Sequence, residues 1–178
     1  MFLYTHSEKL SPEASETGVQ GQRENSFHIT FQTLEKHGLL IWLNKGATIR
    51  GDYLSLAVVD GFLEFSFNLG KQILPLILRS YTRVDNGLWH TAHLQRKERL
   101  GTLRVDDGPV ITATSDPGAT ELNTDGVLWL GGSPGLPTDL PTHYYHGFNG
   151  CIDSVLVDGQ PLYIIMHGSG AVRFCGKS

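Results

Sequence analysis

The stretch of sequence that decides the fold is DYLSLAVVDGFLEFSFNL, residues 52–69. Two apolar-rich segments, residues 52–59 and 62–69, flank the pair Asp60-Gly61. An Asp-Gly pair between two such segments is the strongest short-range signal of a β-hairpin, because a type I′ turn needs positive φ, which glycine adopts at little cost. We therefore predict an antiparallel hairpin that brings residues 52 and 69 to the same end of the fold.

Strand patterns continue on both sides of this hairpin. Residues 27–33 alternate apolar and polar side chains, as one buried sheet face requires, and residues 39–43 form a short continuous apolar run. No segment keeps a helical period over about ten residues, so the sequence predicts about ten to twelve short strands in an all-β sandwich of two antiparallel sheets. Further turns are expected at 85–87, 106–108 and 158–159, and irregular stretches at 44–51, 113–125 and 133–146.

Composition bounds the class of protein. The chain has 178 residues, which suits one domain, and its net charge of −4 argues against nucleic-acid binding. No apolar run reaches the length of a membrane span, so membrane insertion is not expected, and the N-terminus lacks the features of a signal peptide. We expect residues 1–25 to be a flexible leader, either non-native or a partial first strand, followed by one domain at residues 26–178.

The chain has two cysteines, Cys151 and Cys175, with 23 residues between them. A pair near the chain end of a glycine-rich protein of short strands is typical of a disulfide formed in an oxidising compartment. Closing that loop would stabilise the fold by about 3 kcal/mol. On this reading the chain is part of a longer secreted protein, and the alternative is two unpaired thiols in a cytosolic protein.

Nine short motifs in order make the chain resemble the laminin G-like domain, also called the LNS domain. They are GLLIW (38–42), GDYLSL (51–56), VDG (59–61), FNLG (67–70), NGLWH (86–90), LRVD (103–106), LGG (130–132), FNGC (148–151) and VRFC (172–175). Within the family the chain is most similar to the C-terminal modules of agrin, perlecan and pikachurin. The resemblance implies a two-sheet antiparallel jelly-roll sandwich with one C-terminal disulfide, Cys151–Cys175. Residues 1–10 lack the aromatic-Asp-Gly motif of the family's first strand, so one sheet edge is expected to be open.

The resemblance also implies a calcium site at one end of the sandwich. Carried over position by position, its ligands are the Asp52 side chain, the Leu69 and Glu121 main-chain carbonyls, and the Asn123 side chain. Such oxygen ligands are those that Ca²⁺ prefers. Asn123 stands where agrin-like modules commonly have an aspartate, and the lost charge predicts weak binding, on the order of 10⁻⁴ to 10⁻³ M.

In the family, acidic sugar chains such as those of α-dystroglycan bind at this rim. The resemblance therefore implies an extracellular matrix adhesion module, for which Lys45, Arg50 and Lys71 are the candidate glycan-binding residues. A separate basic run, Arg96, Lys97 and Arg99 with Arg104, is a possible patch for heparin or heparan sulfate, and a solvated hairpin tip is its alternative. The alternative function is calcium-independent docking of a cell-surface receptor through loops at 44–51, 71–77 or 133–146.

The sequence does not predict an enzyme. It has no nucleophile elbow, zinc-protease helix motif, phosphate-binding loop or dinucleotide fingerprint. Two minor alternatives are zinc bound by His143 and His146, which lie in one loop, and glycan hydrolysis through Glu64, which lacks an evident partner carboxylate. The aromatic residues Trp42, Trp89, Trp129, Phe65 and Phe67 are predicted to belong to the core rather than to a sugar-binding platform.

Overall fold

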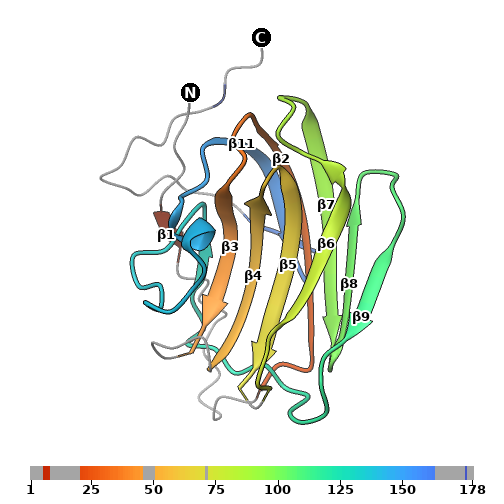
Figure 1. Cartoon of the computed structure of the whole chain (residues 1–178), viewed down its shortest axis with the longest axis vertical. Coiled ribbons are helices and arrows are strands. Elements are labelled where there is room, and N and C mark those ends of the chain that lie inside the picture. The colour runs from red at the N-terminus through yellow and green to blue at the C-terminus, as the bar shows by residue number, and fades with distance from the viewer. Residues whose placement is uncertain (1–5, 9–20, 46–50, 71, 163–174, 176–178) are drawn as a thin grey trace.

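The computed structural model describes the backbone of residues 6–8 and the full residues 21–45, 51–70, 72–162 and 175. Within them, twelve strands form two six-stranded antiparallel sheets that pack against each other (Figure 1). One short 3-10 helix is also present among these residues. This arrangement confirms the predicted all-β sandwich. No helix in these residues has the length and apolar character that crossing a membrane requires.

The first sheet has the predicted hairpin at its centre. Its order is β1-β10-β3-β4-β5-β6, and every neighbouring pair is antiparallel. The bounds are β1 His6–Glu8, β10 Leu128–Leu130, β3 Gly38–Asn44, β4 Asp52–Val59, β5 Phe62–Leu69 and β6 Leu76–Arg83. Strand β1 lies within the segment expected to be a leader, and it pairs with β10, so a short strand occupies the edge that the sequence left open.

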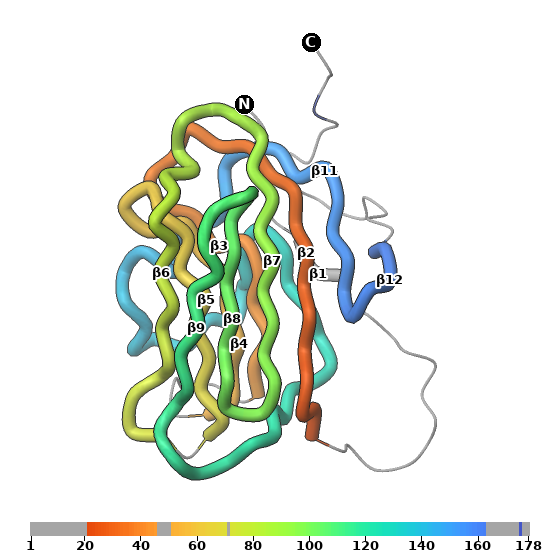
Figure 2. Tube along the Cα trace, turned by 90° about the vertical axis from the view of Figure 1, so that its right-hand side faces the viewer, coloured from red at the N-terminus to blue at the C-terminus, as the bar shows by residue number. Residues whose placement is uncertain are grey.

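The second sheet has the order β12-β11-β2-β7-β8-β9, and in Figure 1 its strands β7, β8 and β9 lie to the right of the first sheet. Its bounds are β12 Gln160–Pro161, β11 Gly150–Val157, β2 Glu24–Thr33, β7 Trp89–Lys97, β8 Leu100–Val105 and β9 Ile111–Thr114. Figure 2 shows these strands side by side, from β9 across to β12. Strand β2 keeps the predicted period of two, with Phe27, Ile29 and Phe31 buried on one face.

The hairpin follows the predicted geometry. Strands β4 and β5 pair without a register shift from Asp52 opposite Leu69 to Val59 opposite Phe62. Asp60 and Gly61 have φ values of 51° and 83°, which are the two positive values of a type I′ turn. Because the two arms are equal in length, the first residue of β4 and the last residue of β5 meet at one end of the sandwich.

Side chains of both sheets fill the main core, and a second, smaller core covers the outer face of the first sheet. The smaller core comprises Leu39, Trp42, Tyr53, Ala57, Val59, Leu140 and Tyr144. Tyr144 belongs to the 3-10 helix η1, Thr142–Tyr145, which packs over β3. Since β3 and β4 are buried on both faces, they have continuous apolar sequences instead of an alternating pattern.

The prediction for the aromatic residues is correct in part. Trp42, Phe65 and Phe67 are buried, and Trp129 is partly buried against the smaller core. The prediction that Trp89 belongs to the core was wrong, because its side chain lies on the outer face of the second sheet and is 47% exposed. It shares strand parity with the outward residues Thr91 and His93, whereas His90 and Ala92 are buried.

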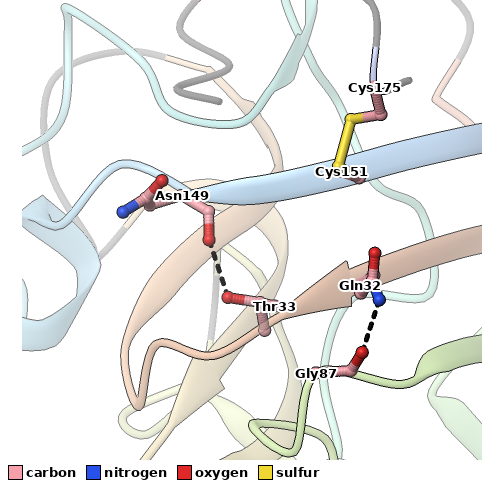
Figure 3. The surroundings of a disulfide bond; sticks show 6 residues. All are labelled: Gln32, Thr33, Gly87, Asn149, Cys151 and Cys175. Carbon is pink, nitrogen blue, oxygen red and sulfur yellow. Dashed lines mark hydrogen bonds between the residues drawn. A yellow bond between two sulfur atoms is a disulfide. The ribbon is translucent and has the colours of Figure 1, made fainter. Parts of the chain in front are cut away.

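The disulfide predicted from the sequence is present (Figure 3). Cys151 of β11 and Cys175 are bonded, and their Cα atoms lie 5.9 Å apart, within the usual range for a disulfide. Cys151 is opposite Gln32 of β2, and the Thr33 hydroxyl donates to the Asn149 carbonyl at 2.7 Å. The disulfide thus ties residue 175 to β11, which pairs directly with β2.

Replacing both cysteines by alanine is expected to lower the free energy of unfolding by about 3 kcal/mol, because the unfolded chain regains the entropy of an open loop. Urea unfolding of the oxidised wild type and the Cys151→Ala/Cys175→Ala variant measures the difference. The reduced wild type serves as the control and should match the variant. An unchanged urea midpoint in the variant would contradict the prediction.

Candidate functional site

The four residues proposed as calcium ligands line one open pocket at an end of the sandwich. The pocket is formed by Asp52, Leu69, Gly70, Gly118, Ala119, Thr120, Glu121 and Asn123. Asp52 and Leu69 come from the hairpin, where they are direct partners, and the other side is the loop between β9 and β10. The Gln72 side chain links the two parts, accepting from the Leu69 N–H at 2.8 Å and donating to the Ala119 carbonyl at 3.5 Å.

Asn123 is hydrogen-bonded to Asp52. Oδ2 of Asp52 accepts from the backbone N–H of Asn123 at 2.6 Å and from its side-chain Nδ2 at 3.0 Å. Gly70 has a φ of 78°, and a Cβ at this position would overlap Oδ1 of the same carboxylate. The carboxylate is therefore held between a glycine turn and the backbone of the loop.

A buried arginine holds the loop that carries Glu121 and Asn123. Arg96 of β7 is 0% exposed, and its guanidinium hydrogen-bonds five oxygens from three segments of the chain. The acceptors are the carbonyls of Gln22 (2.6 Å), Arg23 (3.2 Å), Glu98 (2.9 Å) and Thr120 (3.3 Å) and Oδ1 of Asn25 (2.6 and 2.9 Å). Residues 22 and 122 also exchange two backbone hydrogen bonds, of 2.9 and 2.8 Å.

Arg96 stays charged despite its burial. Desolvation lowers the pKa of Arg96 to about 10, while the negative charge of Asp52 acts in the opposite direction. The guanidinium is thus a permanent positive charge at neutral pH, and Asp52 is the first among the acidic groups that offset it. Asp52 consequently contributes to the charge balance of the buried network as well as to the pocket.

The basic residues proposed for glycan binding are only partly within the described chain. Lys45 is exposed and adjoins the pocket, since its N–H donates to the Asp52 carbonyl at 2.9 Å. Arg50 and Lys71 lie outside the described residues. A cation that the sequence analysis did not single out, Arg23, pairs with Glu121 at 3.1 Å beside the pocket.

The proposed heparin patch does not form as one surface. Arg96 is wrong as a patch residue, because its side chain points into the core. Lys97 pairs with Glu24 at 3.2 Å, and the guanidinium of Arg99 donates to the Ser115 carbonyl at 3.1 Å. Arg104 lies on the outer face of β8, opposite His93 of β7, away from the tip of the hairpin.

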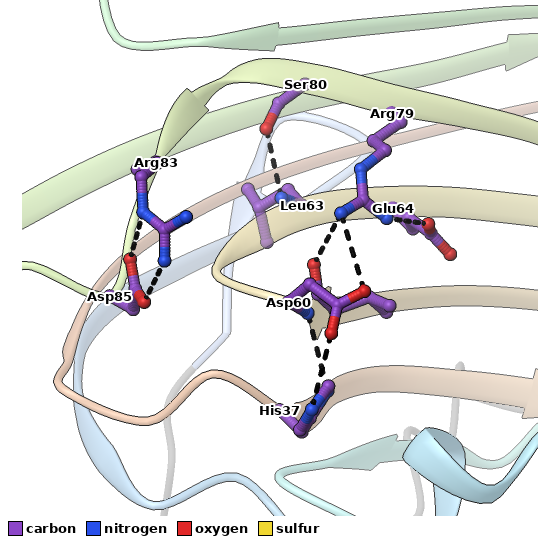
Figure 4. Close-up of polar contacts among 9 residues, drawn as sticks. His37, Asp60, Leu63, Glu64, Arg79, Ser80, Arg83 and Asp85 are labelled. Atoms are coloured by element: carbon purple, nitrogen blue, oxygen red, sulfur yellow. Dashed lines mark hydrogen bonds and ion pairs between the residues drawn. The ribbon is translucent and has the colours of Figure 1, made fainter.

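A second polar cluster, at the other end of the hairpin, offers no free carboxylate (Figure 4). Arg79 contacts Glu64 at 2.5 Å and Asp60 at 3.8 Å, and His37 approaches Asp60 at 3.6 Å. The carboxylate proposed for glycan hydrolysis, Glu64, is therefore mostly buried in an ion pair, with a side-chain exposure of 12%.

Three histidine rings stack beside this cluster. The ring centroid of His37 lies 6.4 Å from that of His143 and 5.8 Å from that of His146. Nowhere in the described part of the chain do three side chains of His, Cys, Asp or Glu gather so that they could hold a metal ion. The zinc alternative therefore has no such cluster to support it among these residues. The calcium candidate differs in kind, because it relies on one carboxylate with amide and carbonyl oxygens.

Comparison with known proteins identifies the class of domain. The family profile described as "Laminin G domain" matches residues 31–163. The chain is 33% identical over 153 residues to the mouse "Basement membrane-specific heparan sulfate proteoglycan core protein", covering 84% of this chain, and 33% identical over 135 residues to bovine "Pikachurin", covering 75%. Among solved structures, the mouse laminin alpha1 chain domains LG4-5 match 84% of this chain and 38% of that chain, at 25% identity and a TM-score of 0.69.

The chain therefore belongs to the laminin G domain family, as its nine motifs indicated. It spans only 4% of the length of the mouse proteoglycan and 13% of that of pikachurin. The relationship accordingly concerns one module of much longer proteins.

Replacing Arg96 with methionine is expected to lower the free energy of unfolding by about 3–5 kcal/mol, because five oxygens from three segments lose their common donor at a fully buried position. Thermal and urea unfolding of Arg96→Met measure the effect. Arg99→Met, three positions along the chain, removes a guanidinium that donates to one carbonyl, that of Ser115, and should cost about 1 kcal/mol or less. Equal losses in the two variants would argue against the role assigned to Arg96.

Proposed function

We propose that this chain is an extracellular matrix adhesion module that binds anionic glycans, or a receptor carrying them, through a calcium-bearing rim. The observation that carries the proposal is the convergence of Asp52, Leu69, Glu121 and Asn123 on one open pocket. The disulfide and the matrix relatives support an extracellular location. Glycans of the α-dystroglycan type, heparin and heparan sulfate are the candidate ligands.

The donor set of the pocket fits a weak calcium site. Asp52 supplies a carboxylate, and Asn123 supplies an amide oxygen from the facing loop. Leu69 and Glu121, whose main-chain carbonyls are the other proposed ligands, belong to the same pocket lining. The side-chain amide of Asn123 now donates its N–H to Asp52. Rotating that amide by half a turn would exchange its nitrogen for its oxygen, which a cation beside Asp52 would favour.

The same hydrogen bond gives the Asp52 carboxylate a partner from within the chain. An aspartate at residue 123 would place two carboxylates together and would need a cation between them. The Asn123 amide satisfies Asp52 with a neutral donor instead. We therefore expect calcium to compete with an internal hydrogen bond, which lowers the affinity below that of a two-carboxylate site.

A bound Ca²⁺ would supply positive charge for the carboxylate or sulfate groups of a sugar chain. Asp52 would fix the position of that ion, because the hairpin and the loop hold its carboxylate at the pocket lining. Lys45 is exposed next to Asp52 and provides a flexible cation for a second acidic group of the same glycan. Arg23 is less available, since Glu121 and Glu98 engage it at 3.1 and 3.5 Å.

Calorimetric titration with calcium is expected to give a dissociation constant on the order of 10⁻⁴ to 10⁻³ M for the wild type. Asp52→Ala should abolish the binding. Asn123→Asp should tighten it by about tenfold, because it restores a second carboxylate. Asp125→Asn, which removes a nearby exposed carboxylate outside the pocket lining, is the matched control and should leave the constant unchanged.

The Asn123→Asp variant also tests the role of the hydrogen bond. Without calcium, the variant should be less stable than the wild type by about 1–3 kcal/mol, because a donor is lost and two like charges meet. Saturating calcium should restore its melting temperature. A variant that is fully stable in a chelator, or a wild type that binds no calcium at several millimolar, would contradict the proposed rim.

A second candidate function, calcium-independent docking of a protein receptor, is favoured by one observation. Ile73 and Leu74 follow the hairpin end next to the pocket, and they are 94% and 71% exposed. Adjacent large apolar side chains at such exposure mark a surface suited to a protein partner. The predicted loop segment 71–77 is thus exposed at these two positions, although its neighbour Gln72 is buried.

Binding of the fluorescently labelled domain to cells in a chelator tests this second function. Ile73→Ser/Leu74→Ser should reduce such binding at least about fivefold if a receptor uses these side chains. Leu34→Ser is a matched control, because Leu34 is 75% exposed in a different loop. Equal binding by the two variants would exclude a receptor contact at residues 73 and 74.

A further inference from the structure

A row of basic side chains crosses the outer face of the second sheet, and none of its residues lines the pocket of the calcium candidate. His28 of β2 is the direct cross-strand partner of His93 of β7, and His93 is the partner of Arg104 of β8. Leu156 of β11 continues the row on the far side of His28. We call His28, His93 and Arg104 the histidine–arginine row. The strands that carry it lie next to one another in Figure 2.

The row lines an open pocket of its own. The pocket includes the three basic side chains, with Gln95, Thr102 and Val110 among its other residues. Gln95 and Val110 are exposed, and the three basic residues are partly exposed. The rings of His28 and His93 are nearly perpendicular, with centroids 4.1 Å apart. The basic groups therefore face solvent together.

The basic side chains of the histidine–arginine row have no anionic partner among the described residues. Arg104 makes neither a hydrogen bond nor an ion pair within this part of the chain, and neither imidazole does. The basic residues elsewhere with a carboxylate within 4.0 Å include Arg23, Arg79, Arg83 and Lys97. Protonating His93 beside Arg104 without a counter-charge costs free energy, so the arrangement is suited to an anion that comes from another molecule.

The groups around the row keep the imidazole of His93 mostly neutral near pH 7 while no anion is bound. Burial, with the positive charges of His28 and Arg104, lowers the pKa of His93. Lys97, on the same strand, is paired with Glu24, and β11 adds only the apolar Leu156 to the pocket. The nearest turn carries Asp158, whose carboxylate is engaged by the Ser26 N–H at 2.8 Å.

A second row of neutral polar side chains runs parallel to the basic one. Ser26, Gln95, Thr102 and Thr112 are successive cross-strand partners on β2, β7, β8 and β9. Their side chains make no hydrogen bond to another described residue, so they are available to hydroxyl groups. Anionic groups beside many hydroxyls are the chemistry of an acidic sugar chain. A nucleic acid would require a larger basic surface than these three groups.

We propose that the outer face of the second sheet is a second, calcium-independent binding site for an acidic oligosaccharide, and that its affinity rises as the pH falls. A sulfate or carboxylate would lie against Arg104 and His93, with sugar hydroxyls on Gln95 and Thr102. The bound anion favours the protonated imidazole, so binding takes up a proton. The site goes beyond the calcium rim and does not depend on it.

Titration of the domain with a sulfated, heparin-derived hexasaccharide and with its desulfated uronic-acid counterpart tests the proposal. All titrations contain a chelator, which silences the calcium rim. At least one of the two sugars should bind, and its affinity should increase about fivefold or more between pH 7.5 and pH 5.5, since linkage of one proton permits up to tenfold for each pH unit. The imidazole resonances of His93 should titrate at higher pH once the sugar is bound.

Variants locate the binding. Arg104→Gln should weaken it about tenfold at both pH values. His93→Gln should remove much of the pH dependence while changing the affinity at pH 7.5 less than about twofold, because the neutral imidazole contributes little charge there. Lys36→Gln, which removes an exposed charge elsewhere, is the matched control and should bind as the wild type does.

Three results would overturn the proposal. The first is that neither hexasaccharide binds at pH 5.5. The second is that Arg104→Gln binds as well as the wild type, with thermal melting showing that it is folded. The third is that Asp52→Ala abolishes binding in the chelator, which would assign the sugar to the rim. Retained binding by Asp52→Ala would support the sheet-face site even if the calcium rim fails its own test.

Discussion

The candidate rim depends on one buried guanidinium. Arg96 donates to backbone or side-chain oxygens of the segment before β2, the turn after β7 and the loop that follows β9. These segments do not form a continuous ladder of backbone hydrogen bonds with one another at this end of the sandwich. The Arg96 guanidinium, with its five N–H donors, bonds their oxygens instead. Its geometry is specific, because a lysine has three donors on one atom and could not reach the same spread of acceptors. The position of Asn123 relative to Asp52 is therefore a consequence of a residue that does not line the pocket.

Electrostatics then limits what the pocket can be. Arg96 is buried and charged, and Asp52 is the main acidic group that offsets it. A cation placed against Asp52 would share the negative charge of that carboxylate with the Arg96 guanidinium. One carboxylate then has to balance two positive groups, which predicts weak cation binding. The Asn123 amide fits this balance, since it bonds Asp52 without adding charge. The weak calcium affinity that we propose rests on the charge count around Arg96 as much as on the missing aspartate.

Apart from the pocket residues, which came from the family resemblance, what the sequence predicted correctly was local. The Asp60-Gly61 hairpin, the continuous apolar strands and the cysteine pair each depend on residues near in sequence or on a single pairing. Arg96 was assigned to a surface patch because neighbouring charges suggested it, although strand alternation puts it on the same face as Ala92 and Leu94. The same alternation places Trp89 outside. The hydrogen bond between Asp52 and Asn123 joins residues 71 positions apart, and no local pattern encodes it.

Strand β7 relates the two proposed sites through its alternation. Its inward residue Arg96 holds the rim loop, while its outward residues His93 and Gln95 belong to the face of the sheet. β7 is hydrogen-bonded on both sides, to β2 and β8, so its backbone is fixed and a change of charge on the outer face has no evident route to the rim. We therefore expect the two proposed sites to respond to different variables, calcium and protons, without altering each other's intrinsic affinity. A long acidic glycan that reached both would gain affinity from effective concentration, and the gain would depend on the length of the glycan instead of on a conformational change in the domain.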